Sequence, residues 1–400
     1  MPTPRSRAKR PAPAKTPNWF TYFPENYRWS AAICGMLSNA QWGSANLGEI
    51  DQVGKRLAGR VGNDDAWFAE FARMGDDVRK LARSTEAQGY NLSAAAHYRR
   101  ACTYFQMAER FRTPKDRRAL GAYRKSINCF HRSIELDRTI PIEPVEVPMP
   151  DGTSLPGYFI PAQNTSKTKP PVLVFFDGLD VTKELQYFRG VPELVRRGIS
   201  VLIMDGPGTG EAIRFRSIYL RHDYEVAGTA ALDYLETRSD VNAKNAGVMA
   251  ISLGGYYASR IASLEPRYKA CVAWGAIWDY HATWKRRIDA AFDADLSVPG
   301  HHIEWILNAN SLDDALRKLE DFKLDGVVQQ MSCPFLVTHG EEDAQIPLSD
   351  AQTLYRAVGS KDKTLKIFTA EEGGAQHCQR DNMSLGVTYI ADWLADRLKA

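Results

Sequence analysis

Short, continuously apolar segments alternate with helical patterns from residue 171 to the C-terminus. A segment that is apolar at every position predicts a strand covered on both faces, which is typical of parallel sheets. Strands are expected at residues 171–176, 199–204, 246–251, 270–274, 335–338 and 365–369. Helices are expected at residues 184–197, 222–237, 254–264, 349–357 and 381–398. This alternation predicts an α/β fold built on a mostly parallel sheet.

Three parts of the chain differ in composition. Residues 1–17 contain five prolines and no aromatic residue, so we expect a disordered basic arm. Residues 18–140 are expected to form a helical domain. Residues 141–400 are expected to form the α/β domain, which opens with a β-hairpin turning at Asp151-Gly152. A helical, aromatic-rich insert at about residues 277–329 is expected to interrupt this domain.

The helical region carries apolar residues at spacings of three and four. Residues 92–112 and 114–137 are expected to pair as a helical hairpin. Ser93 is the expected N-cap of the first helix, and Thr113-Pro114 are the expected N-cap and first residue of the second. The dense aromatic residues at 19–29 fit either core packing or the lining of an aromatic substrate pocket.

The charge distribution argues against a nucleic-acid-binding protein. The net charge is only +3, and the basic surplus lies in the N-terminal arm. The six cysteines are scattered, with no C-x-x-C pair and no secretory signal, which favours reduced thiols in a cytoplasmic protein. No apolar run approaches the roughly 18 residues of a membrane-spanning helix, so no membrane partner is expected.

We expect neither a cofactor nor a metal. Residues 205–210 have the sequence DGPGTG, but the glycine spacing differs from the dinucleotide-binding motif, and Pro207 lacks the N–H that a phosphate would bind. This segment is interpreted as a tight loop near the active site. His281, His301 and His302 lack the spacing of metal ligands.

Ser252 is the candidate nucleophile. It follows the apolar segment 247–251 directly, and Gly254 and Gly255 begin a helical pattern after it. Strand, sharp turn and helix form the context in which α/β enzymes expose a nucleophilic serine. Ala250 occupies the position where this motif usually has a glycine. The short pattern is common, so the interpretation depends on whether a base and an acid accompany the serine.

An acid and a histidine follow in the order expected for such enzymes. Asp343 comes after the expected strand 335–338, and His377 comes after the expected strand 365–369. Glu341 or Glu342 could replace Asp343, and either Asp343 or His377 could instead be an ordinary turn or cap residue. The joint arrangement nevertheless predicts a Ser252–His377–Asp343 triad, in which histidine is the base and aspartate orients it.

An oxyanion hole requires two backbone N–H groups. One is expected at Leu253, directly after the nucleophile, and the other at Leu179, in the loop after the first long buried strand.

Four segments together resemble one branch of the α/β hydrolases. They are residues 178–184 (GLDVTKE), 252–255 (SLGG), 339–343 (HGEED) and 373–379 (GGAQHCQ). The branch contains 2,6-dihydroxypseudooxynicotine hydrolase and the polyketide-shortening hydrolases of fungal pigment pathways. The resemblance covers roughly residues 20–398. It implies an α/β-hydrolase fold with a helical N-terminal lid, a Ser-Asp-His triad, no cofactor and often a dimer.

The resemblance also implies hydrolysis of a C–C bond beside a ketone on an aromatic or polyketide substrate, although relatives are also esterases. Two features depart from the branch: Ala250 replaces a glycine, and an additional lid glutamate has no counterpart that we can align. Asp279 is the nearest acidic candidate for it.

The sequence therefore predicts a serine hydrolase that acts on a small-molecule, aromatic substrate. The alternatives are a carboxylesterase or lactonase, an acyltransferase, or a non-catalytic binding protein with this fold. Helices 92–112 and 114–137 and the insert 277–329 are expected to meet over the active site, where their aromatic residues favour a flat aromatic substrate.

Overall fold

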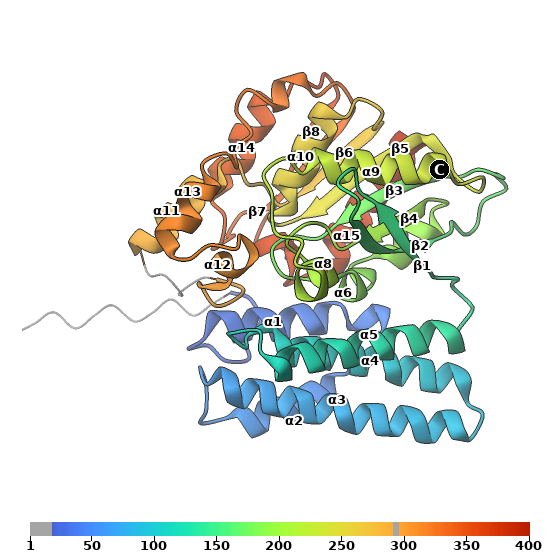
Figure 1. Cartoon of the computed structure of the whole chain (residues 1–400), viewed down its shortest axis with the longest axis vertical. Helices are drawn as coiled ribbons and strands as arrows, with labels where there is room; N and C mark the ends of the chain where they lie inside the picture. The colour runs from blue at the N-terminus through green and yellow to red at the C-terminus, as the bar shows by residue number, and fades with distance from the viewer. Residues whose placement is uncertain (1–17, 291–295) are drawn as a thin grey trace, which may run out of the picture.

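The computed structural model describes residues 18–290 and 296–400 (Figure 1). The predicted disordered arm, residues 1–17, and a short part of the predicted insert lie outside the described residues. In Figure 1, a layer of helices lies beneath a larger part in which helices surround a sheet.

The N-terminal layer consists of α1–α5. Their bounds are α1 (Tyr27–Ser38), α2 (Leu47–Leu57), α3 (Asp64–Ala87), α4 (Asn91–Arg110) and α5 (Arg117–Leu136), with the 3-10 turn η1 (Ala40–Trp42) after α1. Helix α3 approaches α4 closely at Gly75, where a Cβ atom would lie 2.8 Å from the ring of Phe105. Trp29 is fully buried and its ring lies 4.8 Å from that of Trp67, so this part of the aromatic segment 19–29 belongs to the core.

Helices α4 and α5 form the expected hairpin, but both predicted N-caps are wrong. Helix α4 begins at Asn91, and no side chain caps it. Helix α5 begins at Arg117, and the cap is Asp116, whose carboxylate accepts hydrogen bonds from the backbone N–H groups of Arg118 and Ala119. A carboxylate satisfies two otherwise free N–H groups here and favours the positive end of the helix, which explains why the helix begins after Thr113-Pro114.

The sheet has eight strands in the order β1-β2-β4-β3-β5-β6-β7-β8. The bounds are β1 (Glu143–Pro148), β2 (Ser154–Ile160), β3 (Pro171–Phe176), β4 (Ser200–Met204), β5 (Asn242–Ile251), β6 (Ala270–Trp274), β7 (Phe335–Gly340) and β8 (Lys363–Phe368). Strand β2 pairs antiparallel with both β1 and β4, and β3 to β8 pair in parallel. The predicted α/β-hydrolase fold with a mostly parallel sheet is confirmed.

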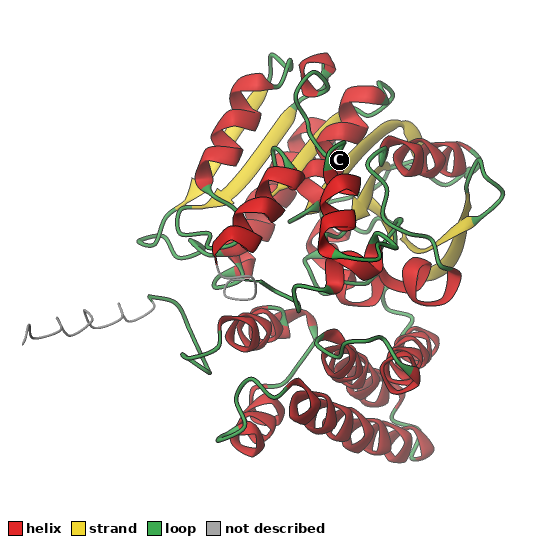
Figure 2. Ribbon diagram, turned by 60° about the vertical axis from the view of Figure 1, so that its left-hand side comes forward, coloured by secondary structure: helices red, strands yellow, loops and turns green. Residues whose placement is uncertain are grey.

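Helices cover both faces of the sheet (Figure 2). They are α6 (Lys183–Tyr187), α7 (Val191–Arg196), α8 (Gly210–Arg216), α9 (Glu225–Glu236), α10 (Gly254–Leu264), α11 (Tyr280–Ala290), α12 (His302–Ile306), α13 (Leu312–Leu319), α14 (Leu348–Ala357) and α15 (Met383–Leu398), with the 3-10 turns η2 (Val328–Gln330) and η3 (His377–Gln379). The single helix expected at 184–197 is broken at Gly190. That residue has φ +85°, and a Cβ atom on it would lie 2.3 Å from the Val387 side chain.

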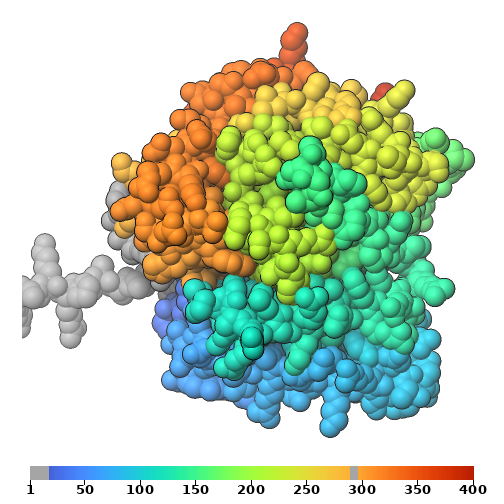
Figure 3. Space-filling model, viewed as in Figure 1, coloured from blue at the N-terminus to red at the C-terminus, as the bar shows by residue number. Residues whose placement is uncertain are grey.

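One hydrophobic core joins the helical layer to the sheet. It includes Phe105 and Phe130 from the layer, Phe175 and Ile203 from the sheet, and Leu394 from α15. A second core fills the opposite face of the sheet, beneath α9, α10 and the insert helices. Figure 3 accordingly shows the helical layer in continuous contact with the α/β part. The predicted boundary at residue 140 precedes β1, and the division into a helical lid domain and a catalytic domain stays a prediction.

Candidate active site

Ser252 lies at a strained turn between β5 and α10. Its φ is +63°, which non-glycine residues rarely adopt, and its backbone N–H donates to the Trp274 carbonyl at 2.8 Å. The following helix passes very close to the sheet, because a Cβ atom on Gly254 would lie 2.6 Å from the Cβ of Ala250. The absence of a side chain at Gly254 therefore leaves room for Ala250, where the motif usually has glycine.

The structure brings Ser252, His377 and Asp343 together. Ser252 Oγ lies 2.7 Å from His377 Nε2, and His377 Nδ1 lies 2.7 Å from Asp343 Oδ2. The backbone N–H groups of Gln345 and Ile346 donate to the other oxygen of Asp343 at 2.8 and 3.0 Å. These bonds hold the carboxylate in the loop after β7, with one oxygen directed at the imidazole.

The alternative acids point elsewhere. Glu341 accepts a hydrogen bond from the Ala370 backbone N–H at 3.0 Å. Glu342 accepts from Asn18 Nδ2 at 2.7 Å near the surface. Neither carboxylate is paired with His377 among the described residues, so Asp343 is the acid that this geometry supports.

Burial and the contacts of the two side chains together determine the charges of His377 and Asp343. It lowers the pKa of His377 below its usual value, against the opposing effect of the Asp343 carboxylate. Burial alone would raise the pKa of Asp343, but its contacts with His377 and the backbone outweigh that effect and lower the pKa to about 2. At neutral pH the aspartate is therefore ionised, and the imidazole is neutral and able to accept a proton.

The two residues predicted for the oxyanion hole border Ser252. Leu179 and Ser252 line one pocket, and Leu253 immediately precedes α10. Gly178 brings the two backbones together, since a Cβ atom there would lie 2.6 Å from the Ile251 carbonyl oxygen and 3.2 Å from the Leu253 nitrogen. Within the described chain, the N–H groups of Leu179 and Leu253 donate no hydrogen bond to protein groups, so both are available to a ligand.

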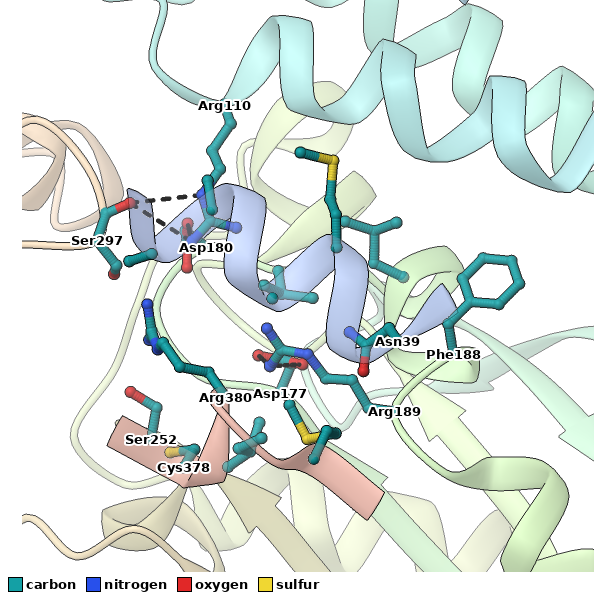
Figure 4. A pocket seen from close by; sticks show the side chains of 18 of the residues that line it. Asn39, Arg110, Asp177, Asp180, Phe188, Arg189, Ser252, Ser297, Cys378 and Arg380 are labelled. Carbon is teal, nitrogen blue, oxygen red and sulfur yellow. Dashed lines mark hydrogen bonds and ion pairs between the residues drawn. The ribbon is translucent and has the colours of Figure 1, made fainter. Parts of the chain in front are cut away.

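The pocket over Ser252 lies between the helical layer and the sheet (Figure 4). Its described lining comprises Ala31, Ala32, Gly35, Met36, Asn39, Ser44, Thr103, Met107, Arg110, Asp177, Leu179, Asp180, Val181, Leu185, Phe188, Arg189, Ile251, Ser252, Ser297, His377, Cys378, Arg380 and Met383. Helix α4 and the insert contribute as expected, but α1 contributes and α5 does not. Phe188 is the only aromatic side chain in this described lining, so the insert tryptophans and the segment 19–29 do not form an aromatic pocket wall.

Charged side chains line much of the pocket. Arg110 of α4 lies 2.7 Å from Asp180, next to Leu179, and Arg189 lies 2.9 Å from Asp177. Burial raises the pKa of Asp177 to about 6, against the lowering effect of Arg189. Arg380 is the third arginine of the lining.

Three further residues lie at the site but were not predicted as site residues. His339 is fully buried, and its Nε2 lies 3.7 Å from Asp343 Oδ2. The Cys378 thiol lies 3.5 Å from His377 Nε2, and burial raises its pKa beyond the physiological range. Cys378 and Arg380 follow His377 by one and three residues, and this closeness in sequence could have indicated that they lie at the site.

Asp279 and the segment 205–210 both lie outside the described pocket lining. Asp279 caps α11, because its carboxylate accepts a hydrogen bond from the Ala282 N–H at 2.8 Å, and it does not line the pocket. The 205–210 segment is a tight loop with φ +85° at Gly208, but it also lies outside the described pocket lining. Asp205 at its start instead binds Lys183, at 2.9 Å.

The described residues contain no group of three or more side chains placed to hold a metal ion. Across the same residues, no helix combines the length and the apolar character needed to cross a membrane.

Known proteins with similar sequences are hydrolases. Hydrolase acrC of Aspergillus aculeatus is 26% identical over 400 residues, which cover 89% of this chain and 92% of that protein. The 2,6-dihydropseudooxynicotine hydrolase of Paenarthrobacter nicotinovorans is 28% identical over 366 residues, which cover 89% of this chain and 92% of that protein. The 20-hydroxy-prefusarin hydrolase of Gibberella moniliformis is 28% identical over 397 residues, which cover 90% and 94%.

The fold has a counterpart of nearly the same extent. The crystal structure of 2,6-dihydroxy-pseudo-oxynicotine hydrolase matches with a TM-score of 0.75 and 23% identity, over 90% of this chain and 95% of that one. Residues 50–399 match the family described as esterase FrsA-like, which includes most of the helical layer and the whole sheet. The chain therefore belongs to the FrsA-like esterase family and is an enzyme, a hydrolase with the α/β-hydrolase fold.

Proposed function

We propose that the enzyme is a serine hydrolase in which Ser252 is the nucleophile and His377 the base. Asp343 orients the imidazole and stabilises the charged form that appears when His377 accepts a proton. The observation that carries this proposal is the unbroken hydrogen-bonded series from Asp343 through His377 to Ser252. It ends at a strained turn that opens into a buried pocket.

In the proposed reaction, His377 Nε2 takes the Ser252 proton while Oγ attacks a substrate carbonyl carbon. The carbonyl π electrons move to oxygen, and the N–H groups of Leu179 and Leu253 stabilise the resulting oxyanion. The oxyanion then collapses, the bond to the leaving group breaks, and His377 returns the proton to that group. Water, deprotonated by His377, hydrolyses the acyl-enzyme in the same way.

The leaving group decides between two reactions at this one site. For a ketone, cleavage of a C–C bond releases a carbanion that must be stabilised as an enolate before protonation. For an ester, an alkoxide leaves. Relatives named as hydrolases of a pseudooxynicotine and of a prefusarin support a substrate of that kind. The branch that the sequence resembles implies C–C hydrolysis beside a ketone, and the family description supports ester hydrolysis. We propose C–C bond hydrolysis of a polyketide-type or aromatic ketone as the physiological reaction, by a cytoplasmic homodimer whose helical layer acts as the lid.

A fluorophosphonate probe tests the nucleophile directly. Mass spectrometry of the treated protein should show one adduct on the peptide that contains Ser252, and Ser252→Ala and His377→Ala should abolish it. Ser44→Ala is the matched control, because Ser44 lines the same pocket but donates to the Met36 carbonyl. Labelling that survives in folded Ser252→Ala would refute the assignment. Light scattering of the purified protein tests the dimer.

A further inference from the structure

The described pocket lining has three arginines, and its aspartates neutralise only two of them. Two of its arginines, Arg110 and Arg189, lie within 3 Å of Asp180 and Asp177 respectively, so each is neutralised in place. The third, Arg380, has no carboxylate within 4 Å among the described residues. A guanidinium that is partly buried and lacks an anionic partner is costly to maintain, which makes it a candidate for ligand binding.

Arg380 is held firmly beside the nucleophile. Its Nε donates to the His377 carbonyl at 3.2 Å, and its own carbonyl accepts from the hydroxyl of Ser38 and the thiol of Cys34 on α1. Because Nε is used in this way, the outer Nη groups remain to face the pocket. Figure 4 shows Arg380 and Ser252 together at one side of that pocket.

The electrostatic environment agrees with this placement. The positive charge of Arg380 contributes to lowering the pKa of His377, although burial is the larger cause. Arg380 therefore lies close enough to the imidazole for its charge to act on groups bound there. A second polar group is also unused, because Asn39 lines the pocket and its Oδ1 is buried without a hydrogen-bond partner. Arg380 and Asn39 therefore give the pocket two polar groups that are available to a polar ligand.

We propose that Arg380 binds an anionic oxygen group of the substrate, carried close to the carbonyl that Ser252 attacks. The inference rests on the proposed function, because it places the anion by reference to the nucleophile. A carboxylate fits the planar guanidinium with two parallel hydrogen bonds, and an enolate oxygen fits with one. The substrate class is then a keto acid or an enolised 1,3-diketone, rather than a flat neutral aromatic compound.

A purely structural role for Arg380 and a role in substrate binding predict different effects of removing its side chain. If Arg380 only kept His377 neutral or fixed η3 against α1, its removal would change reactions of neutral and anionic compounds alike. If it binds the substrate, removal would weaken anionic ligands selectively. The test therefore compares ligands that share one skeleton and differ in charge.

Calorimetry on Ser252→Ala protein separates binding from catalysis. The probes are 4-oxo-4-phenylbutanoate, its neutral amide, and 1-phenylbutane-1,3-dione titrated at a pH where it is an enolate. Loss of a hydrogen-bonded charge pair corresponds to roughly a 10- to 100-fold change in affinity. We expect the acid to bind at least about 10-fold more tightly than the amide, Arg380→Gln to remove the difference, and Arg380→Lys to keep part of it.

The control variant is Arg73→Gln, since the Arg73 side chain is 64% exposed on α3 and should leave all affinities unchanged. A preference for the enolate alone, lost in Arg380→Gln, would support the site and assign it to a diketone. Equal affinity of all three probes, or a preference that survives Arg380→Gln, would overturn the proposal. The outcome for Ser252 is read separately, from fluorophosphonate labelling of the wild-type protein. If the folded wild-type protein forms no adduct on Ser252, the nucleophile is refuted, while the calorimetry still decides on Arg380.

Discussion

Replacing Gly178 with alanine should inactivate the enzyme without unfolding it. An added Cβ atom would lie 2.6 Å from the Ile251 carbonyl oxygen and 3.0 Å from the Ser252 Cβ. Ordinary contact begins at 3.4 Å, so the 178–179 loop and the elbow must separate by about 0.8 Å. The Leu179 N–H would move with the loop, away from the position of the proposed oxyanion.

A shift of this size is enough to break a hydrogen bond. A donor that starts at about 2.9 Å from an oxygen would end near 3.7 Å, beyond the range of a useful bond. Loss of one oxyanion donor costs roughly 10²- to 10³-fold in kcat. The added methyl group should cost about 1–3 kcal/mol of stability through overpacking, which a folded protein of this size can tolerate.

The assay is kcat/KM on an aryl ester, together with thermal unfolding and the rate of fluorophosphonate labelling. Gly121→Ala is the matched control, because no atom lies within 4 Å of a Cβ built on that glycine in α5. It should leave activity unchanged and stabilise the helix by about 0.5–1 kcal/mol. A Gly178→Ala enzyme with activity within about 3-fold of the wild type would refute the assignment of Leu179 to the oxyanion hole.

Further predictions concern pH, catalysis, pocket shape and stability. Because burial lowers the pKa of His377, kcat/KM should stay high below the usual histidine pKa of about 6.5 and fall only at lower pH. A midpoint of the pH profile above about 6.5 would contradict this assignment of the base. Asp343→Asn should reduce kcat by roughly 10⁴-fold. Gly35→Leu should lower kcat/KM for a bulky ester at least about 10-fold more than for an acetate ester, since Gly35 lines the pocket and a Cβ there meets no atom within 4 Å; equal losses would count against it. Glu109→Gln should cost about 3–5 kcal/mol in urea unfolding, because it leaves buried Arg214 unpaired, and a loss below about 1 kcal/mol would disprove the reasoning. Burial raises the pKa of Glu109, but its cationic partners lower it to about 2, so its stabilising effect should be complete above the usual pKa and lost as the pH falls towards 2.

The parts of the fold that were predictable are those that local physics determines. An uninterrupted apolar run such as 171–176 has few alternatives to a buried strand, and it is one. The meeting of Ser252, Asp343 and His377 in space was predictable, because each follows a parallel strand and parallel strands place their carboxyl ends at one edge of a sheet. The helix starts were less predictable, since several polar residues near each start compete as caps, and Asp116 rather than Thr113 satisfies the free N–H groups of α5.

The walls of the pocket could not be predicted in the same way. They depend on how the helical layer is oriented on the sheet, which no local pattern encodes. Aromatic residues of the insert were expected there because they are numerous, yet Tyr280 and Trp284 are buried in the second core instead. Gly35 and Asn39 carry no signal in the sequence, and only the position of α1 over Ser252 gives them a place in the lining.

The helical layer is better understood as half of the active site than as a separate cover. Arg110 reaches from α4 to Asp180, one residue beyond the predicted oxyanion donor, and Glu109 beside it pairs at 2.9 Å with Arg214 of the α/β part. Buried ion pairs contribute little net stability compared with apolar packing, but breaking one partner is costly. They therefore favour one orientation of the layer over others that would bury similar apolar area. Because the Arg110–Asp180 pair adjoins Leu179, the orientation that satisfies these charges is also the one that fixes the 178–179 loop beside Ser252.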